Sequence, residues 1–174
     1  QVTQTKNRLR QLAYYDGLTS LPNRQLFTEQ LQLLLRMSRR DESLLALLFV
    51  DLDNFKRIND SLGHAAGDIL LKEVAVRLSN CLRDTDLISQ NYDSGVKIDV
   101  SRLGGDEFTV LLTDIQSVET VSRKVEQIIA AVAAPLGAEF GNIKTPSCSI
   151  GVACYPADGE DADTLLSRAD ANMY

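Results

Sequence analysis

The chain lacks the residues on which several kinds of active site depend. It contains one histidine and three cysteines among 174 residues, and Cys81, Cys148 and Cys154 do not have the spacing of metal ligands. A histidine-rich metal site is therefore excluded. An odd number of cysteines without such spacing indicates buried thiols in a reducing compartment.

Basic stretches and long apolar runs are also missing. Eighteen Lys and Arg face twenty-four Asp and Glu, for a net charge of −6, and no basic stripe would drive nucleic-acid binding. No signal peptide or membrane-spanning run is present in this piece. We predict a cytoplasmic domain without nucleic-acid or direct membrane contact, whose parent protein could be membrane-anchored. Without repeats, low-complexity tracts or Pro-rich linkers, the chain reads as one compact domain.

The segment Gly104-Gly105-Asp106-Glu107-Phe108 lies between apolar runs. Glycines tolerate positive φ and let a ligand approach the backbone, while Phe108 begins an alternating stretch typical of a strand. The segment predicts a hairpin tip that carries Asp106 and Glu107. Gly-Gly-Asp is also a common hairpin sequence, so the turn alone does not establish a site.

A second acidic element follows the apolar run 44–50, which is typical of a central strand covered on both faces. The run ends in Asp51-Leu52-Asp53, and strand periodicity places both carboxylates on the same side. Carboxylates that face a neighbouring acidic hairpin repel one another unless a proton or cation intervenes. They therefore favour a hard divalent cation, Mg²⁺ or Mn²⁺. The alternative is a pair of solvated carboxylates at a strand end.

Three polar residues after this strand suit a nucleotide. Lys56 offers a compact positive charge for a phosphate. Asn59 and Asp68 offer the mixed donors and acceptors that the edge of a purine base needs. Together with the acidic elements, they predict a nucleotide-binding site.

These residues stand in motifs that resemble the GGDEF domain of bacterial diguanylate cyclases. The resemblance covers residues 16–174 and includes both ends of the chain. The matching segments are Asp16-Gly-Leu-Thr-Ser-Leu-Pro-Asn-Arg24, Asp51-Leu-Asp-Asn-Phe-Lys-Arg-Ile-Asn-Asp60, Gly63-His-Ala-Ala-Gly-Asp68, Arg102-Leu-Gly-Gly-Asp-Glu-Phe108 and Arg168-Ala-Asp-Ala-Asn-Met-Tyr174.

The resemblance implies a catalytic and metal-binding role for four residues. Asp51 and Asp106 would ligate the metal through their carboxylates, with the Leu52 carbonyl as a third protein ligand. Asp106 would also activate the attacking ribose 3′-hydroxyl, and Glu107 would lie beside the metal and the phosphates. Such a site supplies positioning and charge stabilisation, which is what phosphoryl and nucleotidyl transfer need.

The same resemblance implies how the substrate is bound. Asn59 and Asp68 would read guanine, His64 would help to hold their loop, and Lys56 would contact the triphosphate. Arg102 would orient the acidic turn. The substrate-binding set is completed by Gly104 and Gly105.

The implied reaction joins two GTP molecules into cyclic di-GMP and releases two pyrophosphates. One domain holds one GTP, so two must face each other as a homodimer, and a monomer should be nearly inactive. Residues 1–15 read as the end of a helix from an upstream sensor domain, with Val2, Leu9 and Leu12 as seam positions, and residues 16–174 as the cyclase domain. The family continues beyond Tyr174 into a basic segment that contacts the triphosphate, so we expect the domain to be truncated here.

Arg83 and Asp86 match the Arg-x-x-Asp pattern of the family's inhibitory site for cyclic di-GMP. The alternative is a helix-terminal Arg paired with a nearby Asp. The segment 89–101 is longer than the usual connection, and the alternation of Val96, Ile98 and Val100 predicts an extra hairpin that reshapes this site.

The remaining chain predicts an α+β fold, with a mostly antiparallel central sheet flanked by helices. The resemblance implies the palm-like arrangement of nucleotide cyclases. Apolar stripes that predict buried helix faces are Ile69, Leu70, Val74, Leu78, Cys81 and Leu82 in one helix, and Val118, Val121, Val125, Ile128, Ile129 and Val132 in another. The alternative function is a catalytically silent module that binds GTP or cyclic di-GMP and regulates an attached domain.

Overall fold

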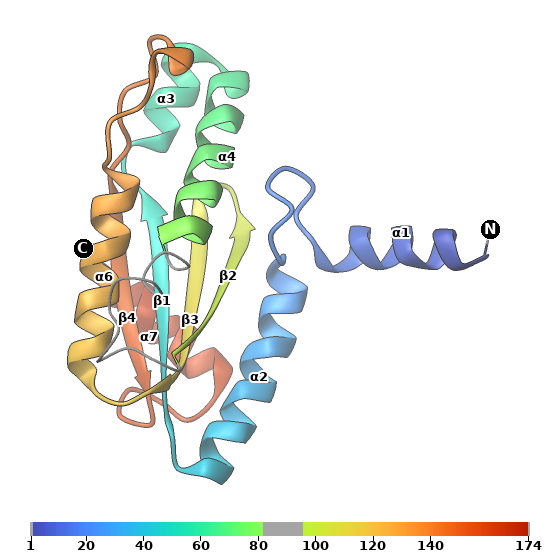
Figure 1. Cartoon of the computed structure of the whole chain (residues 1–174), viewed down its shortest axis with the longest axis vertical. Coiled ribbons are helices and arrows are strands. Elements are labelled where there is room, and N and C mark those ends of the chain that lie inside the picture. Colours follow the sequence, from blue (N-terminus) through green and yellow to red (C-terminus); the bar gives the residue numbers. More distant parts are fainter. Residues whose placement is uncertain (1, 82–95, 174) are drawn as a thin grey trace.

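A four-stranded antiparallel sheet forms the centre of the protein, in the order β2-β3-β1-β4 (Figure 1). The computed structural model describes residues 2–81 and 96–173. The strands are β1 (Leu44–Leu52), β2 (Lys97–Gly104), β3 (Glu107–Ile115) and β4 (Cys148–Tyr155). With helices on both faces, this sheet confirms the predicted α+β, palm-like architecture.

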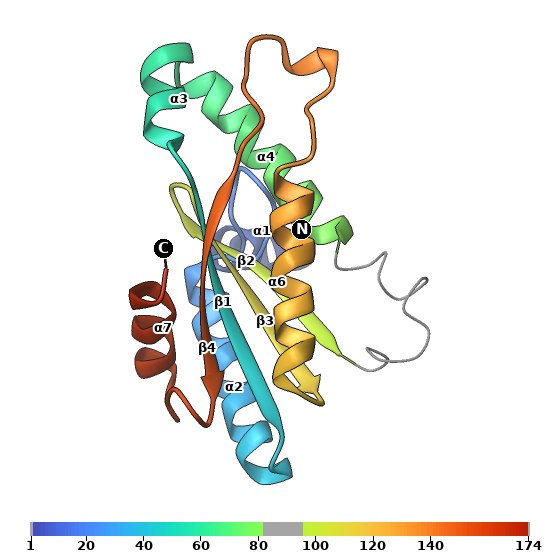
Figure 2. The same ribbon diagram turned by 90° about the vertical axis from the view of Figure 1, so that its left-hand side faces the viewer.

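Helices cover the two faces of the sheet in pairs (Figure 2). One face carries α4 (His64–Cys81) and α6 (Val118–Val132), and the other carries α2 (Arg24–Asp41) and α7 (Ala162–Ala171). The remaining described helices are α1 (Val2–Tyr14), α3 (Phe55–Leu62) and the short 3₁₀ helix η1 (Ala138–Phe140). None of the helices in residues 2–81 and 96–173 is long and apolar enough to cross a membrane.

Strand β1 is buried on both faces, as its continuous apolar run predicts. Ala46, Leu48 and Val50 join the core beneath α4 and α6. The alternate residues, Leu45, Leu47 and Phe49, join the core beneath α2 and α7. Because side chains alternate across a strand, only a strand covered by helices on both sides can be apolar throughout. The position of β1 between β3 and β4 puts its carboxyl end beside two other strands.

Helix α1 extends away from the body of the domain and buries none of its side chains (Figure 1). Val2, Leu9 and Leu12 are 72%, 61% and 73% exposed. Asn23 connects the end of α1 to the start of α2. Its backbone N–H and side-chain amide donate to the carbonyls of Tyr14 and Ala13, and its Oδ1 caps α2 by accepting from the Leu26 N–H.

Arg77 of α4 closes the carboxyl end of α6. Its guanidinium donates to the carbonyls of Ala131, Val132, Ala134 and Pro135, at distances of 3.3, 2.9, 2.6 and 3.2 Å. Its Nε also donates to Glu73, at 2.8 Å. The last carbonyls of a helix have no partner within the helix, so a partly buried cation beside them is well placed to satisfy them. Arg77 thereby fixes where the chain leaves α6.

Two of the predicted helix stripes are partly wrong. Ile69 is 49% exposed, and Val118 and Ile129 are 62% and 43% exposed. Ile69 and Ile129 each lie about 100° around the helix from a buried neighbour, Leu70 or Ile128, which takes them off the covered face. Val118 is the first residue of α6 and is exposed at its end. The buried face of α6 includes Lys124 instead. Leu82 lies outside the described residues.

The alternating residues after the predicted insertion belong to the main sheet. Lys97 pairs with Thr113, and the pairing between β2 and β3 continues to their shared turn. Ile98 and Val100 therefore lie in an edge strand of the sheet, which corrects the expectation of a separate hairpin for these residues. Arg83 and Asp86 lie outside the described residues, and the product site stays a prediction.

Candidate active site

The acidic motif forms the tip of the β2–β3 hairpin. Gly104 and Gly105 have φ values of 141° and 51°, and the pairing register shifts between Arg102 and Gly104. Residues with a side chain rarely adopt such φ values, whereas glycine does so readily. A Cβ at either glycine would have no atom within 4 Å, so the backbone conformation, not crowding, requires glycine here. The turn presents Asp106 and Glu107 as predicted.

The end of β1 lies directly beside this turn. Asp51 is paired in register with Glu107, and the Leu52 N–H donates to the Asp106 carbonyl at 3.3 Å. The Oδ1 atom of Asp51 is buried and has no hydrogen-bond partner in the described part of the chain. A buried carboxylate oxygen without a donor is costly, so this atom calls for a proton or a cation.

The surroundings of Asp51 make its ionised form unfavourable. The pKa of Asp51 is raised to about 7. Burial has the largest effect, followed by a hydrogen bond with the Asp106 carboxyl and by the charge of Asp106. The charges of Glu107 and Asp53 act in the same direction. A bound cation would reverse this effect, because opposite charge favours the carboxylate.

We call the meeting point of Asp51, Leu52, Asp106 and Glu107 the acidic corner. Its ligand atoms suit a hard cation that keeps water ligands. Asp51 and Asp106 offer carboxylates and Leu52 a carbonyl, which are all oxygen ligands of the kind Mg²⁺ takes. Residues 2–81 and 96–173 contain no group of three or more His, Cys, Asp or Glu placed to hold a metal. Two carboxylates and a carbonyl nevertheless suffice for Mg²⁺, which usually takes one or two carboxylates with substrate phosphates and water.

Asp53 differs from Asp51 although it also follows the strand. Its Oδ1 accepts from the Ser149 hydroxyl and its Oδ2 from the Ser147 hydroxyl, both at 2.7 Å. Its N–H donates to the Ser147 carbonyl at 2.9 Å. Asp53 therefore fastens the start of β4 to the end of β1, and its carboxylate faces β4.

Arg102 ties the acidic turn to the segment that follows α1. Its Nε and one terminal nitrogen donate to the Gly105 carbonyl at 3.2 and 2.8 Å, and the other terminal nitrogen donates to Asp16 at 2.8 Å. This is the contact that an orienting role requires. Asp16 also accepts from the backbone and hydroxyl of Thr19. Burial raises the pKa of Asp16, but the hydrogen bonds from Thr19 and Arg102 outweigh burial and lower it overall.

Asn59 is seated between α3 and α4. Its Oδ1 is buried without a hydrogen-bond partner among the described residues. A Cβ at Gly67 would collide with the Asn59 amide, so only glycine at this position leaves room for the side chain. The roles of Gly67 and Asp16 were not predicted. The signal for Gly67 was a glycine inside a helix, where it normally costs stability.

The other predicted substrate ligands are exposed. Lys56 lies in the first turn of α3, His64 begins α4, and Asp68 lies one turn further along. Their exposure leaves them accessible to a ligand beside Asn59. Glu107 lies 3.8 Å from Arg24, and both side chains are substantially exposed, so this ion pair holds the turn only weakly.

Comparisons with known proteins agree with this arrangement. A family model described as "Diguanylate cyclase, GGDEF domain" matches residues 13–174. The chain is 43% identical over 162 residues to diguanylate cyclase TpbB of Pseudomonas aeruginosa PAO1. This match covers 93% of this chain and 34% of TpbB. It is 40% identical over 168 residues to cyclic di-GMP phosphodiesterase NbdA of the same strain, covering 95% of this chain and 19% of NbdA.

A solved structure has the same fold. The GGDEF domain of TpbB, also called YfiN, from Pseudomonas aeruginosa superimposes with a TM-score of 0.77 at 39% sequence identity. The match covers 90% of this chain and 84% of that domain. The chain spans about a third of the length of the curated relative TpbB, and a smaller share of NbdA.

Proposed function

This chain belongs to the GGDEF family, and from that premise we propose that it is a diguanylate cyclase domain, which condenses two GTP molecules into cyclic di-GMP and releases two pyrophosphates. The observation that carries the proposal is the pairing of Asp51 with the acidic turn, where a buried carboxylate oxygen has no donor. In each half of the reaction, a ribose 3′-oxygen forms a bond to the α-phosphorus of the other nucleotide. The bond to pyrophosphate breaks, and the hydroxyl proton leaves with a base.

Asp51, Asp106 and the Leu52 carbonyl would hold Mg²⁺ or Mn²⁺ at the end of β1. The ion would supply positive charge to the triphosphate and to the pyrophosphate that leaves. Asp106 is the candidate to accept the proton of the 3′-hydroxyl, and Glu107 adds a second carboxylate beside the phosphates. Arg102 would keep the turn in place, since it donates two hydrogen bonds to the Gly105 carbonyl.

The substrate would lie along α3 and the start of α4. Asn59 and Asp68 are proposed to read the guanine edge, with Gly67 keeping Asn59 in position. Lys56 would contact the triphosphate, and His64 would help to hold the loop between the helices. Gly104 and Gly105 carry no side chain that would keep the nucleotide away from the turn.

Catalysis would require a homodimer, because each domain presents one acidic turn to one GTP. We propose that residues 1–15 are the end of a helix from an upstream sensor domain and that residues 16–174 form the cyclase domain. The exposure of Val2, Leu9 and Leu12 supports a role for α1 in contacts outside this domain. A cytoplasmic location remains part of the proposal.

Inhibition by the product is proposed to depend on Arg83 and Asp86. Both lie outside the described residues, so support comes from the sequence pattern alone. The test is an Arg83→Ala variant, in which cyclic di-GMP should no longer inhibit synthesis. Unchanged inhibition would remove Arg83 from the proposal.

A second candidate function is a silent module that binds GTP or cyclic di-GMP and regulates an attached domain. The similarity to NbdA favours it, because that relative is named as a phosphodiesterase. The intact acidic turn favours the cyclase.

Product analysis with GTP and Mg²⁺ separates the two functions, with Asp106→Ala as control. The sample should be a C-terminally extended version whose dimerisation and GTP binding are established first. Cyclic di-GMP from the parent alone supports the cyclase. Bound GTP without product from a dimer supports the silent module.

A further inference from the structure

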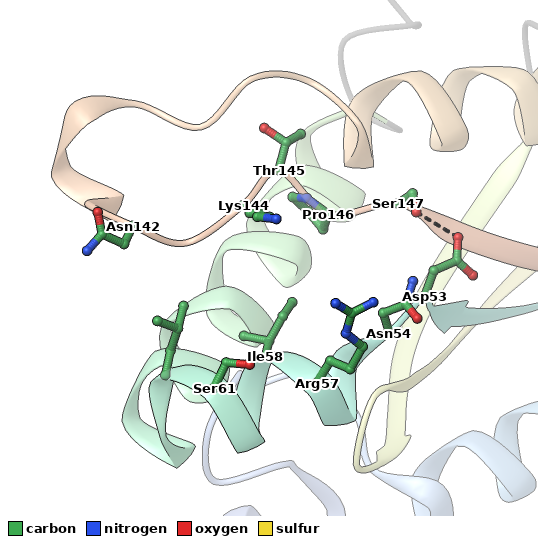
Figure 3. A pocket seen from close by; sticks show the side chains of 11 residues that line it. Asp53, Asn54, Arg57, Ile58, Ser61, Asn142, Lys144, Thr145, Pro146 and Ser147 are labelled. Carbon is green, nitrogen blue, oxygen red and sulfur yellow. Dashed lines mark hydrogen bonds between the residues drawn. The ribbon is translucent and has the colours of Figure 1, made fainter.

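A cleft, here called the β4-side cleft, lies on the β4 side of the end of β1, away from the acidic turn (Figure 3). Its volume is about 290 Å³. One wall is the outer side of α3, and the other is the segment 142–147 that leads into β4. Lys56 and Asn59, which would bind the proposed GTP substrate, do not line it. The cleft is therefore a separate feature of the same strand end.

Two cations from opposite walls contribute to this cleft. Arg57 belongs to α3 and Lys144 to the segment before β4, and Figure 3 shows the Arg57 guanidinium extending toward that segment. Neither side chain makes an ion pair or a hydrogen bond with any residue in 2–81 or 96–173. Two unpaired cations on opposite walls of one cleft repel, and an anion between them would relieve that repulsion.

The single carboxylate in the cleft does not neutralise these cations. Both oxygens of Asp53 accept hydrogen bonds, from Ser147 and Ser149, and neither meets Arg57 or Lys144. Asn54, Ser61 and Thr145 add neutral groups that can donate hydrogen bonds. The lining thus has an excess of positive charge and of donors in a protein whose net charge is −6.

The cleft also has an apolar strip. Ile58 and Leu62 lie one turn apart on α3, and the buried Pro146 forms part of the opposite wall. Ligand sites commonly combine an apolar surface with a few polar groups that fix orientation. A volume near 300 Å³ is at the lower end for such sites and restricts the occupant to a small molecule.

We propose that this cleft binds a small phosphorylated ligand, no larger than a mononucleotide, with its phosphate between Arg57 and Lys144. Guanidinium groups bind phosphate oxygens in a bidentate manner, and Lys adds a second charge. Ile58, Leu62 and Pro146 would contact the less polar part of the ligand. Because Asp53 and Asn54 come two and three residues after Asp51, an occupant would contact the same strand end that carries the acidic corner.

The test is a titration of the ¹⁵N-labelled protein, without GTP or metal, with pyrophosphate and separately with AMP. AMP lacks the guanine edge that Asn59 and Asp68 are proposed to read. We expect amide shifts at Arg57, Ser61 and Thr145 for at least one of these ligands. The variant Arg57→Ala/Lys144→Ala should bind it roughly tenfold more weakly or worse.

A matched control removes two cations elsewhere. Arg40→Ala/Lys97→Ala takes the same charge from the opposite end of the sheet, where each cation already pairs with an acid. Its affinity should stay close to that of the parent. Equal weakening in both variants, shifts confined to Lys56, Asn59 and the acidic turn, or no binding of either ligand would overturn the proposal.

The two ligands also distinguish the source of the phosphate. Binding of pyrophosphate alone points to the leaving group of the proposed reaction, whereas binding of AMP as well points to a separate mononucleotide effector. Arg57→Lys tests the geometry, since it keeps the charge and loses the planar fork. Because the readout is binding without turnover, the result does not depend on whether the domain is an active cyclase.

Discussion

Asp51 and Asp53 lie two residues apart at the end of β1, yet their neighbours differ. Asp51 faces the β2–β3 turn, where the nearest groups are other carboxylates and its Oδ1 has no donor in the described part of the chain. Asp53 faces β4, where two serine hydroxyls occupy both of its oxygens. The same residue type is left unsatisfied on one flank and satisfied on the other. Only the first arrangement leaves a buried carboxylate oxygen without a partner in the described part of the chain, and this supports the proposed metal site on the β3 side.

The largest expected effect separates these two aspartates by activity. Asp51→Asn should reduce cyclic di-GMP synthesis about 1,000-fold or more, since a lost metal ligand removes roughly 4 kcal/mol of transition-state stabilisation. Asp53→Asn keeps an oxygen for one serine and should lose less than about tenfold. Initial rates with saturating GTP and Mg²⁺, on variants shown to be folded by circular dichroism, measure both. Equal losses would mean that the two flanks do not differ in function.

The difference between Asp51 and Asp53 also depends on the acidic turn, which must stay beside Asp51. Arg102→Ala should lower kcat about 10- to 100-fold, because the Gly105 carbonyl loses its anchor and the acidic turn shifts. GTP affinity should change less, since Asn59 and Asp68 lie on other elements. Rates and equilibrium GTP binding, measured on the same samples, test this. Arg102→Lys is the conservative control. The lysine keeps the charge but cannot contact Asp16 and the Gly105 carbonyl at the same time, so this variant should recover only part of the activity.

A smaller effect on stability should appear on the β4 flank. Asp53→Ala leaves the Ser147 and Ser149 hydroxyls without their acceptor and should reduce the free energy of unfolding by about 1–3 kcal/mol. Asp51→Asn should not reduce it in the absence of metal, because it removes a charge that its neighbours repel. Urea denaturation in EDTA measures both. A destabilised Asp51→Asn would contradict the assignment of repulsion to this flank.

The smallest effect is a pH dependence of metal-free stability. The pKa of Asp51 is raised from 3.8 to about 7, so the folded state holds a proton that the unfolded state releases. This contribution to stability is complete below about pH 4 and is lost as the pH rises through 7. The melting temperature of Asp51→Asn should therefore exceed that of the parent by a growing margin toward pH 8, by a few degrees at most after solvent screening.

Magnesium provides the control for the pH experiment. Added Mg²⁺ should raise the melting temperature of the parent at pH 8 and leave Asp51→Asn nearly unchanged, because ligands that bind only the folded state stabilise it. Parallel pH profiles for the two proteins in EDTA would contradict the raised pKa. A shift with Mg²⁺ in both proteins would place the ion elsewhere.

The sequence predicted the acidic corner better than it predicted the flanks around it. Strand β1 is evident from its apolar run, and the hairpin from its glycines, so the meeting of Asp51 with the turn could be anticipated. The different surroundings of Asp53 could not, because its partners Ser147 and Ser149 are 94 and 96 residues away and only the register of β4 brings them close.

The helices show a similar limit. An apolar residue at helical spacing indicates a buried face only if the partner surface is wide enough, and Ile69, Val118 and Ile129 lie beyond it. Gly67 shows the reverse case, in which a residue without a side chain is part of the site because Asn59 occupies the space beside it. Such roles follow from tertiary contacts that local patterns do not contain.

Arg77 has a consequence for how this domain can vary among its relatives. It fastens the chain to α4 at residues 131–135, and Asp53 fastens it again at Ser147. The stretch between them, which includes η1, is joined to the core at both ends, so a change in its length need not move either end. Surface segments of this kind tolerate insertion and deletion. Insertions and deletions could therefore change the wall of the β4-side cleft while the acidic corner stays intact. Relatives with the same fold could in this way differ in the small molecules that they bind there.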